Sequence, residues 1–260
     1  ADRPATPTRA AARRAGSAVR TVVVDAGHGG PDRGMTGPIG GGPRIYEKDI
    51  TLDVARALGE RLQRAGVRVV YTRTTDTLIA LSDRGRIAND AQGDLFISVH
   101  VNAANPAWKS PGGARGFETY FLAEAKTEDA QRVERMENEA VQFETSDAEV
   151  RKGDPLSFIV ADMLQNEHLR ESSELAELIQ RRLRQVHPGP SRGVKQAGFR
   201  VLVTAFMPSV LVEIGFGTNP SEAAYIASRE GQAEIADAVA AAAMEYLERY
   251  ERRVGGGGGE

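Results

Sequence analysis

Short apolar runs alternate with longer stretches of helical periodicity along most of this chain. The apolar runs predict strands, which are Thr21–Asp25, Val67–Thr72, Leu95–His100, Gly116–Leu122 and Ser209–Ile214. Apolar residues spaced three and four apart predict helices over Glu47–Ala65, Ser82–Ala91 and Arg229–Tyr250. Ser82 is expected to cap the second of these helices. The alternation favours an α/β fold, with a mostly parallel twisted sheet and helices on both faces.

Residues 123–172 interrupt this alternation. The segment Lys126–Phe143 is strongly charged, yet its few apolar residues recur at helical spacing. Asp154 and Pro155 then supply an N-cap and a first-turn proline for a second amphipathic helix, expected to continue into Ser173–Val186. We interpret residues 123–172 as a helical insertion on the sheet framework.

The two ends of the chain lack apolar periodicity. Residues 1–20 are dominated by Ala, Arg, Pro and Thr, which predicts a linker or disordered segment. Residues 251–260 end in a run of glycines and predict a flexible tail. One domain over residues 21–250 is therefore expected.

Composition narrows the class of protein. A chain of 260 residues, 41% hydrophobic and 27% charged, can bury one sizeable core. Its net charge of −3 gives no reason to expect a nucleic-acid partner. No apolar run approaches the roughly 18 residues of a membrane span. The absence of cysteine excludes thiolate metal ligands and cysteine nucleophiles.

Two of the four histidines lie at or close to the ends of predicted strands. His28 and His100 would reach the same edge of a parallel sheet, where α/β proteins place functional groups. With Glu47, at the start of a helix, they form the ligand set of a catalytic zinc site with one position open for water. The alternatives are core or capping histidines, and a glutamate that complements the helix dipole. Asp49 is a weaker ligand candidate.

Glu213 interrupts an apolar strand, where a carboxylate is costly unless it is paired or functional. We interpret it as a general base that takes a proton from the attacking water and passes it to the leaving nitrogen. The alternative is a glutamate exposed at the sheet margin. His168 and His187 lie outside any motif, and we assign them no role.

Several motifs in their order along the chain resemble one known family. They are Val24-Asp-Ala-Gly-His28-Gly-Gly, the Glu47 helix start, Thr72-Arg-Thr-Thr-Asp76, Leu81-Ser-Asp-Arg84, Ile97-Ser-Val-His100-Val-Asn102 and Pro208-Ser-Val-Leu-Val-Glu213-Ile-Gly-Phe216. This pattern resembles the zinc-dependent N-acetylmuramoyl-L-alanine amidases of the Amidase_3 type, the bacterial cell-separation amidases, over about residues 21–250.

The resemblance implies that His28, Glu47 and His100 bind one Zn²⁺ and that Glu213 is the catalytic glutamate. The implied substrate is peptidoglycan, cut at the amide between N-acetylmuramic acid and L-alanine for wall remodelling and daughter-cell separation. The implied location is the periplasm or another extracytoplasmic part of the bacterial envelope. We expect a monomer that neither spans a membrane nor binds nucleic acid.

The resemblance also implies a function for the insertion. In the cell-division branch an inhibitory helix covers the groove and a glutamate from it occupies the open zinc position. The candidates here are Glu134, Glu137, Glu139 and Glu144, of which Glu137 best matches the family segment. A LytM-like activator protein would displace the helix. The apolar stripe of Leu156–Leu169 suits either docking of such a partner or packing on the sheet.

Two other functions remain open at this point. A zinc peptidase would cut within the stem peptide, although the motifs argue against it. A catalytically silent wall-binding module would have lost a zinc ligand or Glu213, and this chain retains all four residues.

Overall fold

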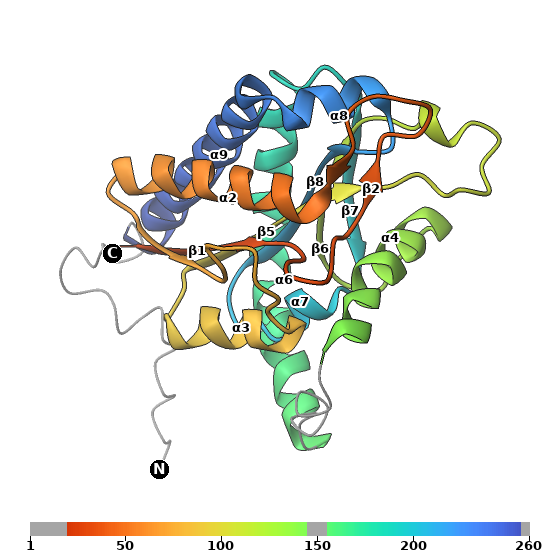
Figure 1. Ribbon diagram of the computed structural model, residues 1–260. Helices are drawn as coiled ribbons and strands as arrows, with labels where there is room; N and C mark the ends of the chain where they lie inside the picture. Colours follow the sequence, from red (N-terminus) through yellow and green to blue (C-terminus); the bar gives the residue numbers. More distant parts are fainter. Residues whose placement is uncertain (1–19, 145–154, 256–260) are drawn as a thin grey trace, which may run out of the picture.

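A six-stranded sheet forms the centre of the molecule (Figure 1). The computed structural model describes residues 20–144 and 155–255, and for residues 155–167 and 254–255 it describes the backbone alone. The strand order is β4-β1-β5-β8-β6-β7. These strands are β1 (Thr21–Ala26), β4 (Arg68–Tyr71), β5 (Leu95–Asn102), β6 (Phe117–Leu122), β7 (Ser191–Ala197) and β8 (Ser209–Phe216).

The sheet is mixed but mostly parallel. Strands β4, β1, β5 and β8 pair in parallel, whereas β6 pairs antiparallel with β8 and parallel with β7. The carboxyl ends of β1, β5 and β8 therefore meet at one edge, as the sequence predicted for the two strands that end at or close to His28 and His100. A small ribbon of β2 (Thr36–Gly37) and β3 (Ile45–Tyr46) lies in the loop after β1.

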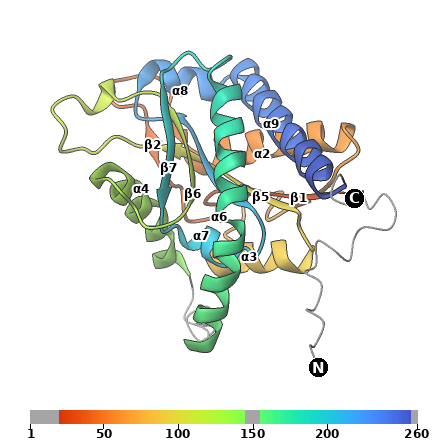
Figure 2. The ribbon, with the colours of Figure 1, turned by 180° about the vertical axis from the view of Figure 1, so that it is seen from behind.

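Helices cover both faces of the sheet (Figures 1 and 2). The helices are α2 (Glu47–Arg64), α3 (Leu81–Asp90), α4 (Glu128–Asn138), α6 (Pro155–Leu183), α7 (Arg200–Val203), α8 (Pro220–Ala227) and α9 (Arg229–Gly255), with short 3-10 turns η1 (Pro111–Gly113) and η2 (Glu139–Phe143). The buried apolar residues form two clusters, one on each face of the sheet, and successive side chains of β1 alternate between them. Val22 and Val24 pack with α2, α6 and α9, while Val23 packs on the face covered by α3, α4 and α7. The predicted fold class is confirmed.

Two details of the predicted elements are wrong, and some elements were not predicted. Helix α3 begins at Leu81 after an Ala80 N-cap that has no side-chain bond, so Ser82 does not cap it. The Leu81 amide instead donates to Oε1 of Glu144 at 2.8 Å. Helix α9 continues through Gly255, so part of the predicted tail is helical. Strand β7 was not predicted at all.

The insertion consists of α4, η2 and the N-terminal part of α6. Thr127 caps α4 by accepting from the Ala130 amide at 3.1 Å, and Ala130 and Val133 are buried in the core of that face. The predicted continuation of the second helix is confirmed, because α6 is one helix of 29 residues. Its N-terminal part extends beyond the sheet (Figure 2). The predicted linker, the Asp154 cap and most of the Leu156–Leu169 stripe lie outside the residues or side chains described.

No helix in the described part of the chain combines the length and apolar character needed to cross a membrane.

Candidate metal centre and active site

His28 lies in the turn that follows β1, with an unusual backbone conformation. Its φ of 60° falls in the left-handed region, which is uncommon outside glycine and needs support from its surroundings. Two arginines supply that support by donating to carbonyl oxygens of the turn. Arg84 binds the carbonyls of Ala26 and His28 at 2.6 and 2.9 Å. Arg73 binds those of Ala26 and Gly27 at 3.0 and 2.8 Å.

Arg84 also forms a buried ion pair with Asp25 at 2.8 Å. Thr72 and Ser98 donate further hydrogen bonds to the same carboxylate, at 2.5 and 2.6 Å. Burial acts to raise the pKa of Asp25, but Arg84 and the two hydroxyls outweigh it and hold that pKa below its usual value. The motifs around residues 72–76 and 81–84, which the sequence marked without assigning a role, therefore position the turn that carries His28.

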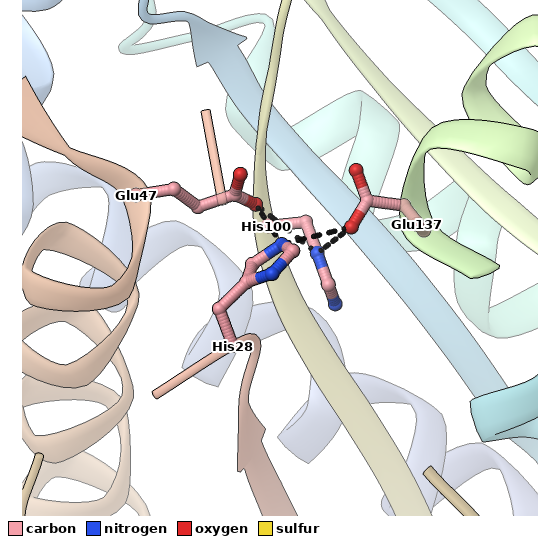
Figure 3. A group of neighbouring side chains, drawn as sticks. All are labelled: His28, Glu47, His100 and Glu137. Carbon is pink, nitrogen blue, oxygen red and sulfur yellow. Dashed lines mark hydrogen bonds and ion pairs between the residues drawn. The ribbon is translucent and has the colours of Figure 1, made fainter. Parts of the chain in front are cut away.

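Four buried side chains converge at the edge formed by β1 and β5 (Figure 3). They are His28, Glu47, His100 and Glu137, and the ligand atoms they offer all lie within 4.8 Å of one another. Glu47 Oε1 is 3.1 Å from both His28 Nε2 and His100 Nδ1. Glu137 Oε2 is 3.0 Å from His28 Nε2 and 2.6 Å from His100 Nδ1. The structure thus brings together the three predicted ligands and the predicted inhibitory glutamate.

Backbone amides also bind both oxygens of the Glu47 carboxylate. The Met35 amide donates to Oε2 at 2.7 Å and the Val101 amide to Oε1 at 2.8 Å. Two glycines make room for this packing. A Cβ at Gly27 would lie 2.5 Å from the His100 ring, and one at Gly34 would lie 2.5 Å from Glu47 Oε2.

Asp32 is a site residue that the sequence reasoning missed. Its Oδ2 lies 2.8 Å from His28 Nδ1, and its Oδ1 accepts from the Gly34 amide at 3.1 Å. A carboxylate on the outer nitrogen of a histidine fixes the tautomer and makes the inner nitrogen a better metal ligand. Its position four residues after His28 in the same turn was the available signal.

The electrostatics of the cluster suit a bound cation. Burial favours neutral imidazoles, but Glu47 and Glu137 raise the pKa of His28 well above its usual value. Burial likewise acts against the charged form of His100, and Glu137 and Glu47 outweigh it to raise its pKa to about 10. Two carboxylates facing two imidazoles are also a donor set typical of Zn²⁺. Oε1 of Glu137 is buried without a hydrogen-bond partner among the described residues. The residues therefore fit a metal ion.

Glu213 lies beside this cluster, directly opposite His100 on the neighbouring strand. It is fully buried, and both of its carboxylate oxygens lack a hydrogen-bond partner in the described part of the chain. Burial, followed by the negative charge of Glu137, raises its pKa well above the usual value. An unpaired buried carboxylate beside a metal-ligand cluster is suited to proton transfer, and the exposed alternative is excluded.

The other glutamates of the insertion have different surroundings. Glu134 Oε2 accepts from the Gly198 amide at 2.9 Å, Glu144 binds the start of α3, and Glu139 is exposed. Of the four candidates, Glu137 alone lies in the described metal-ligand cluster.

Asp49 and the other two histidines are not members of the cluster. Asp49 is exposed. His187 is buried between Phe117 and Tyr225, with ring centroids 4.8 and 5.2 Å away, and its Nδ1 accepts from the Gly189 amide. Neither His187 nor His168 belongs to the described cluster.

Comparison with known proteins shows the family to which this chain is similar. Residues 22–245 match the N-acetylmuramoyl-L-alanine amidase family, Amidase_3. The N-acetylmuramoyl-L-alanine amidase AmiA of Escherichia coli K12 is 32% identical over 237 residues, which cover 90% of this chain and 78% of AmiA. This chain therefore belongs to the Amidase_3 family of N-acetylmuramoyl-L-alanine amidases.

Solved structures show the same fold. The N-acetylmuramoyl-L-alanine amidase AmiC2 of Nostoc punctiforme superposes with a TM-score of 0.64 at 28% identity, covering 90% of this chain and all of that one. An N-acetylmuramoyl-L-alanine amidase from Clostridium difficile 630 gives the same TM-score and identity, covering 88% of this chain and 97% of the other.

The buried ion pair beneath His28 yields a stability prediction. We expect Arg84→Met to lower the free energy of unfolding by about 3–5 kcal/mol, because it leaves Asp25 charged, buried and without its cation. Urea unfolding followed by circular dichroism measures this change. Arg86→Met is the matched control, since the side chain of Arg86 is 58% exposed and its ion pairs lie at the surface. Equal small losses in both variants would contradict the assigned role of Arg84.

Proposed function

We propose that this protein hydrolyses the amide bond between N-acetylmuramic acid and L-alanine in peptidoglycan, using one zinc ion. The observation that carries the proposal is the convergence of His28, Glu47 and His100 beside the unpaired carboxylate of Glu213. The names of the related amidases give the scissile bond. Three protein ligands leave a position for water or substrate, as hydrolytic zinc sites require.

Each residue has a distinct part in this proposal. His28 Nε2, His100 Nδ1 and a Glu47 oxygen would hold the ion, and Asp32 would orient His28. Bound zinc supplies Lewis acidity and lowers the pKa of water. Glu213 takes a proton from the attacking water onto a carboxylate oxygen and delivers it to the leaving amide nitrogen. Its raised pKa favours holding that proton between the two transfers.

Glu137 is the proposed inhibitor. Its Oε2 lies among the same nitrogens that would bind the metal, so it would take the position that water or substrate needs. Helix α4 is held closed by apolar contacts of Val133 and by hydrogen bonds of Asn138 to Gly198 and Arg200. Activity would then require displacement of α4. We propose that a LytM-like activator protein does this.

The cellular setting follows from the substrate. We propose that the protein acts as a monomer outside the cytoplasm, in the periplasm or an equivalent part of the cell envelope, during daughter-cell separation. The related wall amidases support this setting.

Metal removal tests the ligand set. We expect one zinc per chain by elemental analysis, and we expect chelation to abolish hydrolysis and lower the melting temperature, because three buried ligands lose a shared cation. His100→Ala should lose the zinc. His168→Ala, which changes a histidine outside the cluster, should retain it. Full zinc occupancy in His100→Ala would contradict the assignment.

Substitution of the proposed base tests the chemistry. We expect Glu213→Gln to keep zinc and fold normally but to lower kcat at least about 100-fold, because the amide cannot accept a proton. Mass spectrometry of digested peptidoglycan identifies the bond: released stem peptides should begin at L-alanine. Shorter peptides would indicate the peptidase alternative, and unreduced kcat would exclude Glu213 as the base.

Removal of the Glu137 carboxylate tests the proposed autoinhibition. We expect Glu137→Ala to raise activity without an activator by about tenfold or more while zinc stays bound, because the closed state loses its contact with the metal site. Glu139→Ala, an exposed neighbour, is the control and should leave basal activity unchanged. A Glu137→Ala protein with wild-type basal activity and full zinc would contradict autoinhibition.

A further inference from the structure

A row of polar side chains starts at the metal-ligand cluster and crosses the sheet beneath α4 toward the edge strand β7. His100 on β5 lies opposite Glu213 on β8, and Glu213 lies opposite Glu118 on β6. From the edge strand β7, Arg192 and Lys195 reach Glu118. The row therefore extends from the metal-ligand cluster, past the proposed base, to a pair of cations.

Arg192 and Lys195 both bind two carboxylates, one from the sheet and one from helix α4. Arg192 Nε and Lys195 Nζ bind Glu118 Oε2 at 2.9 and 2.5 Å. Arg192 Nη2 and Lys195 Nζ also bind Asp129 Oδ2, at 2.9 and 2.8 Å. Glu118 belongs to the sheet and is fully buried, with its other oxygen bound by Asn102 and Tyr120. Asp129 belongs to α4.

Displacement of α4 would therefore remove only one of the two carboxylates. Two positive charges would then face the single negative charge of Glu118. Arg192 Nη2 and Lys195 Nζ would each lose Asp129 as an acceptor. The cations would stay in place, because Glu118 still binds both. Aromatic rings also support them, with Arg192 over Phe216 at 5.0 Å and Lys195 over Tyr120 at 5.8 Å. A carboxylate is the ligand that matches such a pair.

Spacing relates this pair to the scissile bond. Asp129 and Glu137 are eight residues apart on one helix, which separates them by about 12 Å along its axis. From His100 to β7 the row spans three strand spacings, or about 14 Å. An extended peptide advances about 3.3–3.6 Å per residue. A stem peptide whose first amide lies at the metal would bring its third or fourth residue to the cations.

We infer that Arg192 and Lys195 form a subsite for a free carboxylate of the stem peptide, and that Asp129 occupies this subsite while α4 is closed. This inference rests on the proposed amidase function and names its substrate specificity. Helix α4 then imitates the substrate at two points, with Glu137 at the metal site and Asp129 at the cationic subsite. The competing explanation is that the pair serves only to anchor α4.

The test uses a background in which α4 contributes neither carboxylate, Glu137→Ala with Asp129→Asn. Two soluble muropeptides are compared, one with free stem-peptide carboxylates and one with the same carboxylates converted to carboxamides. In this background we expect kcat/KM to favour the free-acid substrate by about tenfold, through KM, because a charge-assisted hydrogen bond is lost with the amide. Adding Lys195→Gln should reduce the preference to near one.

Control variants distinguish recognition of the substrate carboxylate from unfolding of the protein and from a nonspecific effect of lowering its positive charge. Lys109→Gln removes an exposed charge elsewhere and should leave the preference intact. Arg192→Lys keeps a cation and should retain part of the preference, whereas Arg192→Gln should lose it and serves as the second variant if Lys195→Gln unfolds. A preference that survives both glutamine substitutions, or that is absent in the background itself, would overturn the subsite. Failure to cleave either muropeptide would instead contradict the proposed amidase function.

Discussion

The ion pair between Arg84 and Asp25 is the contact on which the geometry of the metal centre depends. One buried guanidinium from the first turn of α3 binds the Asp25 carboxylate and the Ala26 carbonyl at the end of β1 and the His28 carbonyl in the turn that follows. That turn holds His28 in a left-handed conformation, which persists only where surrounding contacts outweigh its cost. Because β1 also pairs with β5, the same contact sets the position of His28 relative to His100.

Carboxylates near the two ends of helix α4 pair with positively charged or protonatable groups at the sheet, whereas the carboxylate of Glu213 between them has no such partner among the described residues. Glu137 faces two imidazoles and Asp129 faces two cations, while Glu213 between them remains buried and unpaired within the described structure. An unpaired buried carboxylate is costly in the folded state. Glu213 thus combines full burial with the absence of a hydrogen-bond partner among the described residues.

The sequence predicts the centre of the site far better than its surroundings. The three expected metal ligands stand where strands or helices meet loops, and Glu213 interrupts an apolar run, so each has a local signal. Glu118 and Lys195 have no local signal in the sequence. Their role becomes visible only from their contact in the fold, because 77 residues separate them along the chain. Strand β7 is half-buried along most of its length and shows no apolar alternation. Helical spacing alone does not separate Glu137 from Glu134, one turn earlier, and the family resemblance decided that choice.

The antiparallel pairing of β6 with β8 explains why a helix follows β6 over this face of the sheet. The carboxyl end of β6 lies at the edge of the sheet opposite the metal centre, so the chain must return across the face. Fewer than six residues join Leu122 to the start of α4. A segment tethered so closely rebinds at an effective concentration in about the millimolar range. Substrate and the helix would therefore compete continuously for one surface, and closure would need no second molecule.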